Sequence, residues 1–336
     1  MKYSRRRVVS ALAATAALAG GGLARAGKPP YRIYMLLWRG PTEVETGFKD
    51  YLAENNIPVE FTVRSLERER SRIPGFVAEI RRLKPDLVYT WGTPATLGVV
   101  GPYDAVDPAR HITDIPVLFT MVSSPDGARV VPDFSSSRRN VTGVTHIVPL
   151  PTQIKAIQSY VTLRKLGSIY NPLEENSVAI TGRLIDLGRK MGFRVVDLPV
   201  PLGADGKPDP GALPALVDKA AKAKVDMLYI GPDTFIGVHR RRYTQLALDA
   251  GLPTFAAAEL SIRSADALMG LVSRYYNVGR LTAFKAQQIL AEGRRPADMP
   301  IETLKRFSLI IRMKVARRLG IYPPVGLLNY AEVIED

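Results

Sequence analysis

The sequence predicts an α/β protein of two lobes, each a doubly wound parallel sheet with helices on both faces. Short β-rich runs alternate with amphipathic helical stretches, and this alternation is typical of parallel sheets. There are more such units than one compact sheet accommodates. The pattern breaks near residues 140–151, where prolines follow the Ser135-Ser136-Ser137 run. We therefore expect the division between the lobes at this break.

Local signals define the elements of the first half. A capping box, Thr42-x-x-Glu45, opens a helix that Asn55 ends. Residues 59–63 alternate apolar with polar side chains, as in a strand with one wet face. Pro74 suits the first turn of a second helix. The expected elements are strand 31–37, a helix from Thr42, strand 59–63, a helix from Pro74, and strands 87–89 and 117–119.

The same alternation continues through the second half. Apolar runs that suit buried strands are separated by stretches with helical periodicity. The expected strands are 168–170, 194–198, 227–230, 254–257 and 268–272. The expected helices are 152–163, 176–191, 213–223, 238–250 and 277–291.

The first 26 residues have the three parts of an export signal. A charged start, Ser4-Arg5-Arg6-Arg7-Val8-Val9, precedes an apolar region that ends at Ala24-Arg25-Ala26. The paired arginines resemble the twin-arginine export pattern, with an ordinary secretory signal as the alternative. The apolar region falls short of the ~20 residues that span a bilayer. We expect cleavage after about Ala26 and a periplasmic protein that is not embedded in the membrane.

Composition limits the classes of partner and the sources of stability. The chain has no cysteine, so neither disulfides nor a lipid-modified cysteine are available. Removing the five cations of the signal lowers the formal charge from +14 to +9. The basic runs are scattered and lack the aromatic side chains of a nucleic-acid surface. We therefore expect a solvated basic surface and no nucleic-acid partner. We also expect a monomer.

Signatures of catalysis and metal binding are absent from the sequence. There is no nucleophile elbow and no phosphate-binding loop. His111, His146 and His239 are far apart in the sequence, and none forms a ligand-spaced pair. Glu174 and Glu175 precede a predicted helix, where a favourable interaction with the helix dipole explains them. We expect no catalytic residues, no metal and no cofactor.

Small polar residues follow the predicted strands of the first half. The run Trp91-Gly92-Thr93-Pro94-Ala95-Thr96 joins a strand to a helix, and free amides at a helix start suit a carboxylate. Pro94 has no N–H, which leaves Ala95 and Thr96 as donors beside the Thr93 hydroxyl. Ser123 and Ser124 follow the next strand and offer a hydroxyl and an amide. The alternative for each junction is an ordinary helix cap.

Equivalent junctions follow the strands of the second half. Tyr170 and Asn171, then Asp233 and Thr234, and then Glu259 occupy these positions. Asp233 and Glu259 could accept an ammonium group, while a helix cap and a solvated carboxylate are the respective alternatives. Trp38 and Tyr275 could pack on an apolar or aromatic part of a ligand, or in the core.

These junctions, in this order, resemble those of the substrate-binding proteins of ATP-binding-cassette importers, specifically the tryptophan- and tyrosine-binding type. The resemblance runs from about Tyr31 to Glu335. It rests on the order of several short pieces rather than on any one of them. The pieces are residues 91–95, 115–119, 140–144, 170–172, 231–234, 296–302, 313–321 and 323–324.

The resemblance implies a type I periplasmic binding protein, whose two lobes are joined by three crossovers. It implies one lobe of residues 27–146 with 275–302, and a second of 147–274 with 303–336. Relatives hold the carboxylate of an amino acid at the first lobe, here Thr93, Ala95 and Ser123, with Asp233 acting from the second. Relatives often have Asp-Pro where this chain has Ser124-Pro125. Losing that carboxylate removes one partner for an ammonium group, which argues against an α-amino acid. Amino-acid-like, aromatic and organic-acid ligands therefore all stay open.

The function expected from the resemblance is that of a receptor that delivers a small molecule to a membrane permease. A receptor that presents its closed form to a signalling partner is the first alternative. A periplasmic α/β enzyme is the second. The sequence does not identify the ligand.

Overall fold

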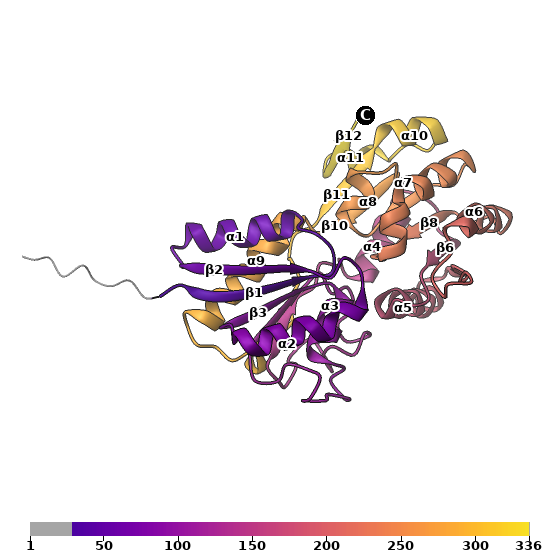
Figure 1. Cartoon of the computed structure of the whole chain (residues 1–336). Helices are drawn as coiled ribbons and strands as arrows, with labels where there is room; N and C mark the ends of the chain where they lie inside the picture. The colour runs from indigo at the N-terminus through magenta and orange to yellow at the C-terminus, as the bar shows by residue number, and fades with distance from the viewer. Residues whose placement is uncertain (1–28, 336) are drawn as a thin grey trace, which may run out of the picture.

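The chain folds into two lobes, each built on its own sheet (Figure 1). The structure is a computed structural model that describes residues 29–335. One sheet has five strands and the other seven, which confirms the predicted two-lobed α/β class. The export signal expected in residues 1–26 lies outside the described residues. Within residues 29–335 we find no helix with the length and apolar character that a membrane span requires.

The first sheet is parallel throughout and has the strand order β2-β1-β3-β4-β5. Its central strands are buried on both faces, which explains their continuous apolar runs. Because all five strands run the same way, their carboxyl ends meet at one edge. The strands are β1 (Tyr31–Leu37), β2 (Val59–Ser65), β3 (Leu87–Trp91), β4 (Val117–Thr120) and β5 (Val141–Val144).

Helices cover both faces of the first sheet. Figure 1 shows α1 (Glu43–Glu54) and α9 (Tyr275–Leu290) over one face, with α2 (Ile73–Leu83) and α3 (Thr93–Val100) over the other. The predicted capping box at Thr42 and Glu45 is present at the start of α1. Helices α1 and α9 cross closely at Gly47 and Gly279. A Cβ at either glycine would lie 2.0 Å from a backbone oxygen of the other helix.

The second sheet has the strand order β12-β11-β10-β9-β8-β6-β7. It is parallel from β10 to β7, whereas β11 runs antiparallel to β10, and β12 runs parallel to β11. Five of the strands coincide closely with the predicted runs, and β11 and β12 were not predicted. The strands are β6 (Lys165–Tyr170), β7 (Arg194–Pro199), β8 (Met227–Ile230), β9 (Thr254–Ala256), β10 (Met269–Val272), β11 (Ser308–Arg312) and β12 (Ala331–Ile334).

Two hydrophobic clusters, one on each face of the second sheet, hold its helices. Along β8, Met227 and Tyr229 join one cluster, whereas Leu228 and Ile230 join the other, since successive side chains of a strand point to opposite faces. Helices α4, α5 and α10 pack into the first cluster, and α6, α7 and α8 into the second. The helices are α4 (Leu150–Gln158), α5 (Glu175–Met191), α6 (Leu213–Lys222), α7 (Thr234–Asp249), α8 (Glu259–Arg263), α10 (Met313–Leu319) and α11 (Val325–Leu328).

The chain passes between the two sheets three times: after β5, between β10 and α9, and before β11. The first and third passages lie side by side, because the Thr145 amide donates to the carbonyl of Glu302 over 2.8 Å. Lys285 of α9 is fully buried, and its Nζ bonds the Pro300 carbonyl at 2.7 Å and the Glu302 carboxylate at 2.8 Å. These bonds tie α9 to the third passage.

Candidate functional site

A cavity of about 70 Å³ lies between the lobes, at the carboxyl ends of the parallel strands of both sheets. Parallel α/β sheets bind ligands at this edge. The first lobe contributes residues that follow β1, β3, β4 and β5. The second lobe contributes residues that follow β6, β8 and β9, and Tyr275 begins α9 just after the passage from β10. The cavity is therefore a candidate ligand site.

Aromatic side chains line the first-lobe side of the cavity. Trp38 follows β1 and Trp91 is the last residue of β3, and both are buried. The guanidinium of Arg39 lies 4.6 Å from the centre of the Trp91 ring, a distance at which a cation is attracted to the ring face. The buried Nε of Arg39 has no hydrogen-bond partner among the described residues. This side of the cavity therefore offers apolar surface and a positive charge.

The start of α3 contributes one hydroxyl to the cavity. Thr93 lines it, whereas Ala95 is fully buried and is not among the lining residues. The Thr96 amide donates to the Gly92 carbonyl over 3.1 Å, as the first hydrogen bond of the helix. The sequence-based expectation that Thr96 has a free amide is therefore wrong. The reason is that helical bonding begins at this residue.

Of the two serines that follow β4, one lines the cavity. Ser123 is a lining residue. Ser124 is 1 % exposed and lies within hydrogen-bond distance of the Asp126 carboxylate, at 3.4 Å. It is not among the lining residues.

Two buried carboxyl groups line the second-lobe side of the cavity. Asp233 is the N-cap of α7, and its Oδ1 accepts from the Ile236 amide at 2.8 Å. Its Oδ2 accepts from the Asn171 amide at 2.7 Å. Glu174 lies beside it and accepts from the Thr234 amide at 2.7 Å. Among residues 29–335, neither carboxyl group has an ion-pair partner.

The burial of this pair makes both groups hold their protons more tightly than usual. Burial and the neighbouring Asp233 raise the pKa of Glu174 to about 8. Burial also raises the pKa of Asp233, against the opposing effect of its backbone hydrogen bonds. Two adjacent carboxylates without a cation are costly to bury. A positively charged group that entered the cavity would relieve that cost.

A buried histidine and a tyrosine close the cavity where the chain passes between the lobes. The His146 and Tyr275 rings contact edge to face, with 6.1 Å between centroids. Burial and the charge of Arg39 lower the pKa of His146 to about 3, so the imidazole is neutral at neutral pH. Its buried Nδ1 has no hydrogen-bond partner within the described part of the chain. Burial raises the pKa of Tyr275 to about 12.

The cavity brings together six of the eleven residues that sequence reasoning selected. These are Trp38, Thr93, Ser123, Asp233, Thr234 and Tyr275. The other five are not among the lining residues. They are Ala95, Ser124, Tyr170, Asn171 and Glu259.

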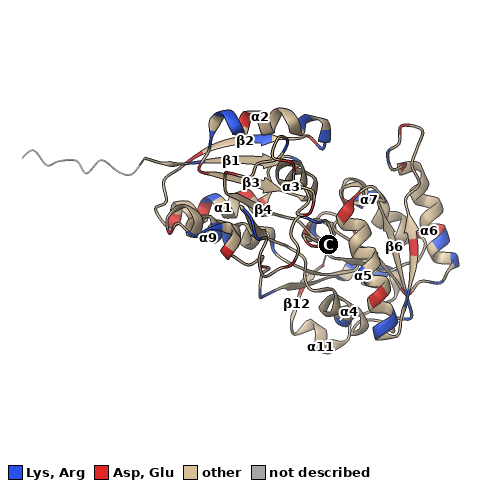
Figure 2. Cartoon of the chain, turned by 90° about the horizontal axis from the view of Figure 1, so that it is seen from below, with Lys and Arg blue, Asp and Glu red and all other residues tan. Residues whose placement is uncertain are grey.

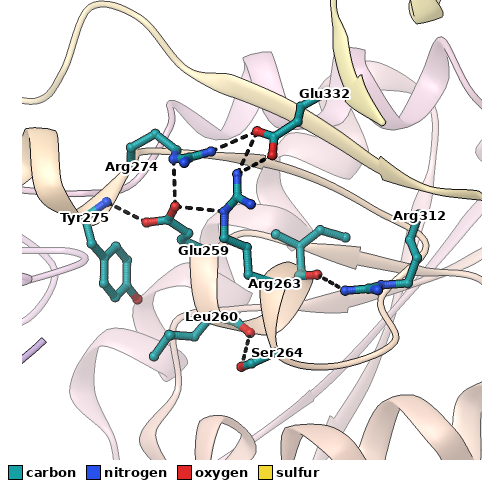
Figure 3. A network of polar contacts seen from close by, with 9 residues as sticks. Glu259, Leu260, Arg263, Ser264, Arg274, Tyr275, Arg312 and Glu332 are labelled. Carbon is teal, nitrogen blue, oxygen red and sulfur yellow. Dashed lines mark hydrogen bonds and ion pairs between the residues drawn. The ribbon is translucent and has the colours of Figure 1, made fainter. Parts of the chain in front are cut away.

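Glu259 lies in an ion-pair network with Arg263, Arg274 and Glu332 (Figure 3). The alternative of a solvated carboxylate required an exposed, unpaired group, whereas Glu259 is buried and ion-paired. Asn171 supports the site indirectly through its bond to Asp233. Both residues therefore bond to residues that line the cavity, Asp233 and Tyr275, but do not line it themselves.

Sequence reasoning missed Arg39, His146, Glu174 and Asn176, all of which line the cavity. The helix-dipole explanation placed Glu174 and Glu175 together, but the structure separates them. Glu174 is buried at the cavity, whereas Glu175 lies outside it and pairs with Arg70. Arg39 directly follows Trp38, and that adjacency was the available signal for it.

Three polar side-chain contacts among the described residues connect the two lobes across the cleft. The Trp38 indole donates to the Thr234 hydroxyl over 3.3 Å. Arg70 pairs with Glu175 at 2.8 Å, and Arg183 of α5 pairs with Asp126 of the first lobe at 2.7 Å. The lobes are therefore in contact around the cavity, as in the closed form of a hinged clamp.

The described part of the chain, residues 29–335, has no group of three or more side chains placed to hold a metal ion. Its basic and acidic residues, blue and red in Figure 2, are spread over the helices of both lobes. Two sheets that meet around a cavity with polar and aromatic sides define a two-lobed ligand-binding protein.

Comparison with known proteins identifies the family. Residues 40–334 match the model of the ABC transporter substrate-binding protein family. The chain belongs to this family, and it is a solute-binding protein of an ABC transporter. It is also 25 % identical over 278 residues to a tyrosine-binding protein of Clostridioides difficile, covering 82 % of this chain and 74 % of that protein.

Solved structures support the fold. A conserved domain protein of Vibrio cholerae matches with a TM-score of 0.77 and 22 % identity, over 91 % of this chain and 99 % of that chain. A Streptococcus ABC domain in complex with L-Trp matches with a TM-score of 0.75 and 23 % identity, over 90 % and 100 % of the two chains. The likeness confirms the type I periplasmic binding-protein fold.

Proposed function

We propose that this protein binds an α-amino acid with an aromatic side chain between its lobes and delivers it to a membrane permease. The observation that carries the proposal is the polarity of the cavity. Glu174 and Asp233 form an acidic pair that has no ion-pair partner among the described residues on one side, and Arg39 is an incompletely bonded cation on the other. An α-amino acid carries one charge of each sign and complements both sides.

The ligand is oriented by these charges. Its ammonium group faces Glu174 and Asp233, and its carboxylate faces the Thr93 and Ser123 hydroxyls and Arg39. Its side chain packs between Trp38, Trp91 and Tyr275. Aromatic rings bury a large apolar area in such contacts, which favours an aromatic ligand over a small aliphatic one.

The serine at position 124 argues less strongly against an amino acid than the sequence suggested. Ser124 does not line the cavity, so an aspartate there is not required for an ammonium site. Glu174 supplies a carboxyl group that the sequence analysis had assigned to the helix dipole. A relative described as tyrosine-binding and a similar domain that holds L-Trp also support the proposal.

Transport requires that the clamp open and close. For this movement we take residues 27–146 with 275–302 as one rigid unit, and residues 147–274 with 303–336 as the other. A ligand that contacts both units shifts the population toward the closed form. We further propose that the chain acts as a monomer in the periplasm after export through the twin-arginine route and cleavage near Ala26.

Intrinsic fluorescence provides a direct test, because the only two tryptophans of the chain, Trp38 and Trp91, both line the cavity. Titration with L-tyrosine or L-phenylalanine should change the tryptophan emission until it saturates, and calorimetry should give the same affinities. L-Tryptophan is itself fluorescent, so its affinity is measured by calorimetry alone. Succinate and glucose serve as controls without an ammonium group. If no amino acid binds while a dicarboxylate does, the proposal is wrong.

A further inference from the structure

A network of four charged side chains joins the last strand of the chain to the start of α9 (Figure 3). Glu332 of β12 bonds Arg263 at 2.6 Å and Arg274 at 2.8 Å. The same two arginines reach Glu259 of α8, at 3.1 Å and 2.8 Å. Each carboxylate therefore holds both arginines, and each arginine holds both carboxylates.

Glu259 also bonds the backbone of a residue that lines the cavity. Its Oε2 accepts from the Tyr275 amide over 2.6 Å. Tyr275 is the first residue of α9, and Arg274, at the N-cap, makes no side-chain cap of its own. A carboxylate at this position satisfies a free amide and favours the positive end of the helix. Glu259 therefore caps α9 from a different helix.

The Tyr275 side chain extends from this capped position into the cavity. In Figure 3 its ring points away from the network, and it contacts His146 edge to face. The ring can move only if the start of α9 moves or if the Tyr275 side chain adopts another rotamer. The Glu259 carboxylate accepts from the amide at the helix start, and both arginines contact that carboxylate.

Glu332 is the second carboxylate that both arginines contact. Burial raises the pKa of Glu259, and its bonds to the Tyr275 amide and Arg263 oppose that rise. With one carboxylate and two arginines, the network would carry an excess positive charge, and Arg263 and Arg274 would repel each other. Glu332 balances the charges, so the arrangement around Glu259 is held by a residue outside the cavity.

We propose that Glu332 is a positioning residue for ligand binding, which acts through Arg263, Arg274 and Glu259 on the place of Tyr275 in the cavity. The effect on ligand affinity rests on the proposed function. The effect on α9 does not. The C-terminal strand thereby contributes to a site that none of its own residues lines.

The first test compares Glu332→Gln with Glu335→Gln in the full chain. Glu335 follows the same strand but pairs with Arg317, outside the network. Hydrogen exchange of the Tyr275 amide, followed by NMR, should be several-fold faster in Glu332→Gln than in the wild type, and unchanged in Glu335→Gln. Equal exchange in all three proteins overturns the proposal, whether or not a ligand is known.

The second test measures affinity for L-tyrosine and L-tryptophan by calorimetry. Glu332→Gln should weaken binding about five-fold, within the range of partly exposed ion-pair networks, and Glu335→Gln should not. In a Tyr275→Ala background the same change should have no further effect, because interacting residues are not additive. An equal loss in both backgrounds contradicts an action through Tyr275. No binding by the wild type would instead refute the proposed function, and the exchange result would still decide the role of Glu332.

Discussion

Trp38 and Thr234 are 196 residues apart in the sequence, yet the indole Nε1 of one donates to the hydroxyl of the other over 3.3 Å. Trp38 follows the first strand of one lobe, and Thr234 begins α7 of the other. The bond therefore exists only while the lobes are together. Both residues also line the cavity, so closure of the clamp and completion of the site are one event.

Removing this bond should favour the open clamp. Thr234→Val keeps the shape of the side chain but removes the acceptor, at a cost to the closed form of about 0.5–1.5 kcal/mol. Small-angle X-ray scattering of the ligand-free variant should show a larger radius of gyration than the wild type. Thr62→Val, in β2 and away from the cavity, is the control. A variant as compact as the wild type would show that the bond has no part in closure.

Salt should open the ligand-free clamp in the same assay. The pairs Arg70–Glu175 and Arg183–Asp126 cross the cleft with partly exposed side chains, and salt screens such charges. Raising ionic strength should increase the radius of gyration, and Arg183→Glu should do so at low salt. The surface pair Arg189–Asp186 lies within α5, so Arg189→Glu is the matched control. A salt-independent radius would contradict this prediction.

Glu174→Gln should weaken binding of an aromatic amino acid while stabilising the ligand-free protein. The variant loses a charged partner for the ammonium group, which corresponds to about 1.5–3 kcal/mol, or roughly 10- to 150-fold in affinity. It also removes one of two adjacent buried acids, and the melting temperature should rise. Asp186→Asn, on the surface of the same region, should change neither quantity. Unchanged affinity in calorimetry would remove Glu174 from the site.

The affinity for an amino acid should rise with pH between about 6 and 8. The pKa of Glu174 is raised to about 8, so the pair must release a proton before it can accept an ammonium group. Calorimetry in buffers of different ionisation enthalpy should detect that release. In the absence of ligand, the pH dependence of stability has the opposite sign. Between about pH 4.5 and pH 8 the folded state keeps a proton on Glu174 that the unfolded state has released, so the free energy of unfolding falls as the pH rises across this range. Glu174→Gln should lack both effects.

Export offers a separate prediction about residues 1–26. Lysine retains the charge of arginine but not its planar, forked donors, so a twin-arginine signal should not tolerate replacement of both Arg5 and Arg6 by lysine. Cell fractionation should find the double variant in the cytoplasm and the wild type in the periplasm. Normal export of the variant would indicate an ordinary secretory signal.

The regular part of the fold could be predicted because local chemistry determines it. The Thr42 capping box and the apolar run at 227–230 each identify an element within a few residues. The tail could not be predicted in the same way. The strands at 308–312 and 331–334 join the edge of a sheet that was formed earlier in the chain, and β11 does so antiparallel. That pairing depends on tertiary contacts, which periodicity does not report.

The site was predicted where it coincides with the ends of strands. Asp233 and Thr93 follow predicted strands, and both line the cavity. Glu174 and Glu175 show the limit of this approach. Glu174 is the N-cap of α5 and Glu175 its first helical residue, so their side chains leave the backbone in different directions, and periodicity does not report which of them is buried. His146 was overlooked because it comes from a passage between the lobes rather than from a junction of strand and helix.

The crossing of α1 and α9 has a consequence for the order in which the protein can fold during synthesis. Helix α1 ends at Glu54, whereas its packing partner α9 ends at Leu290. The apolar face of the first sheet beneath α9 stays uncovered until nearly the whole chain has left the ribosome. The strands β6 to β10 of the second lobe are made within that interval. The lobe that begins first is therefore completed late, and a nascent chain must protect its exposed sheet from aggregation in the meantime.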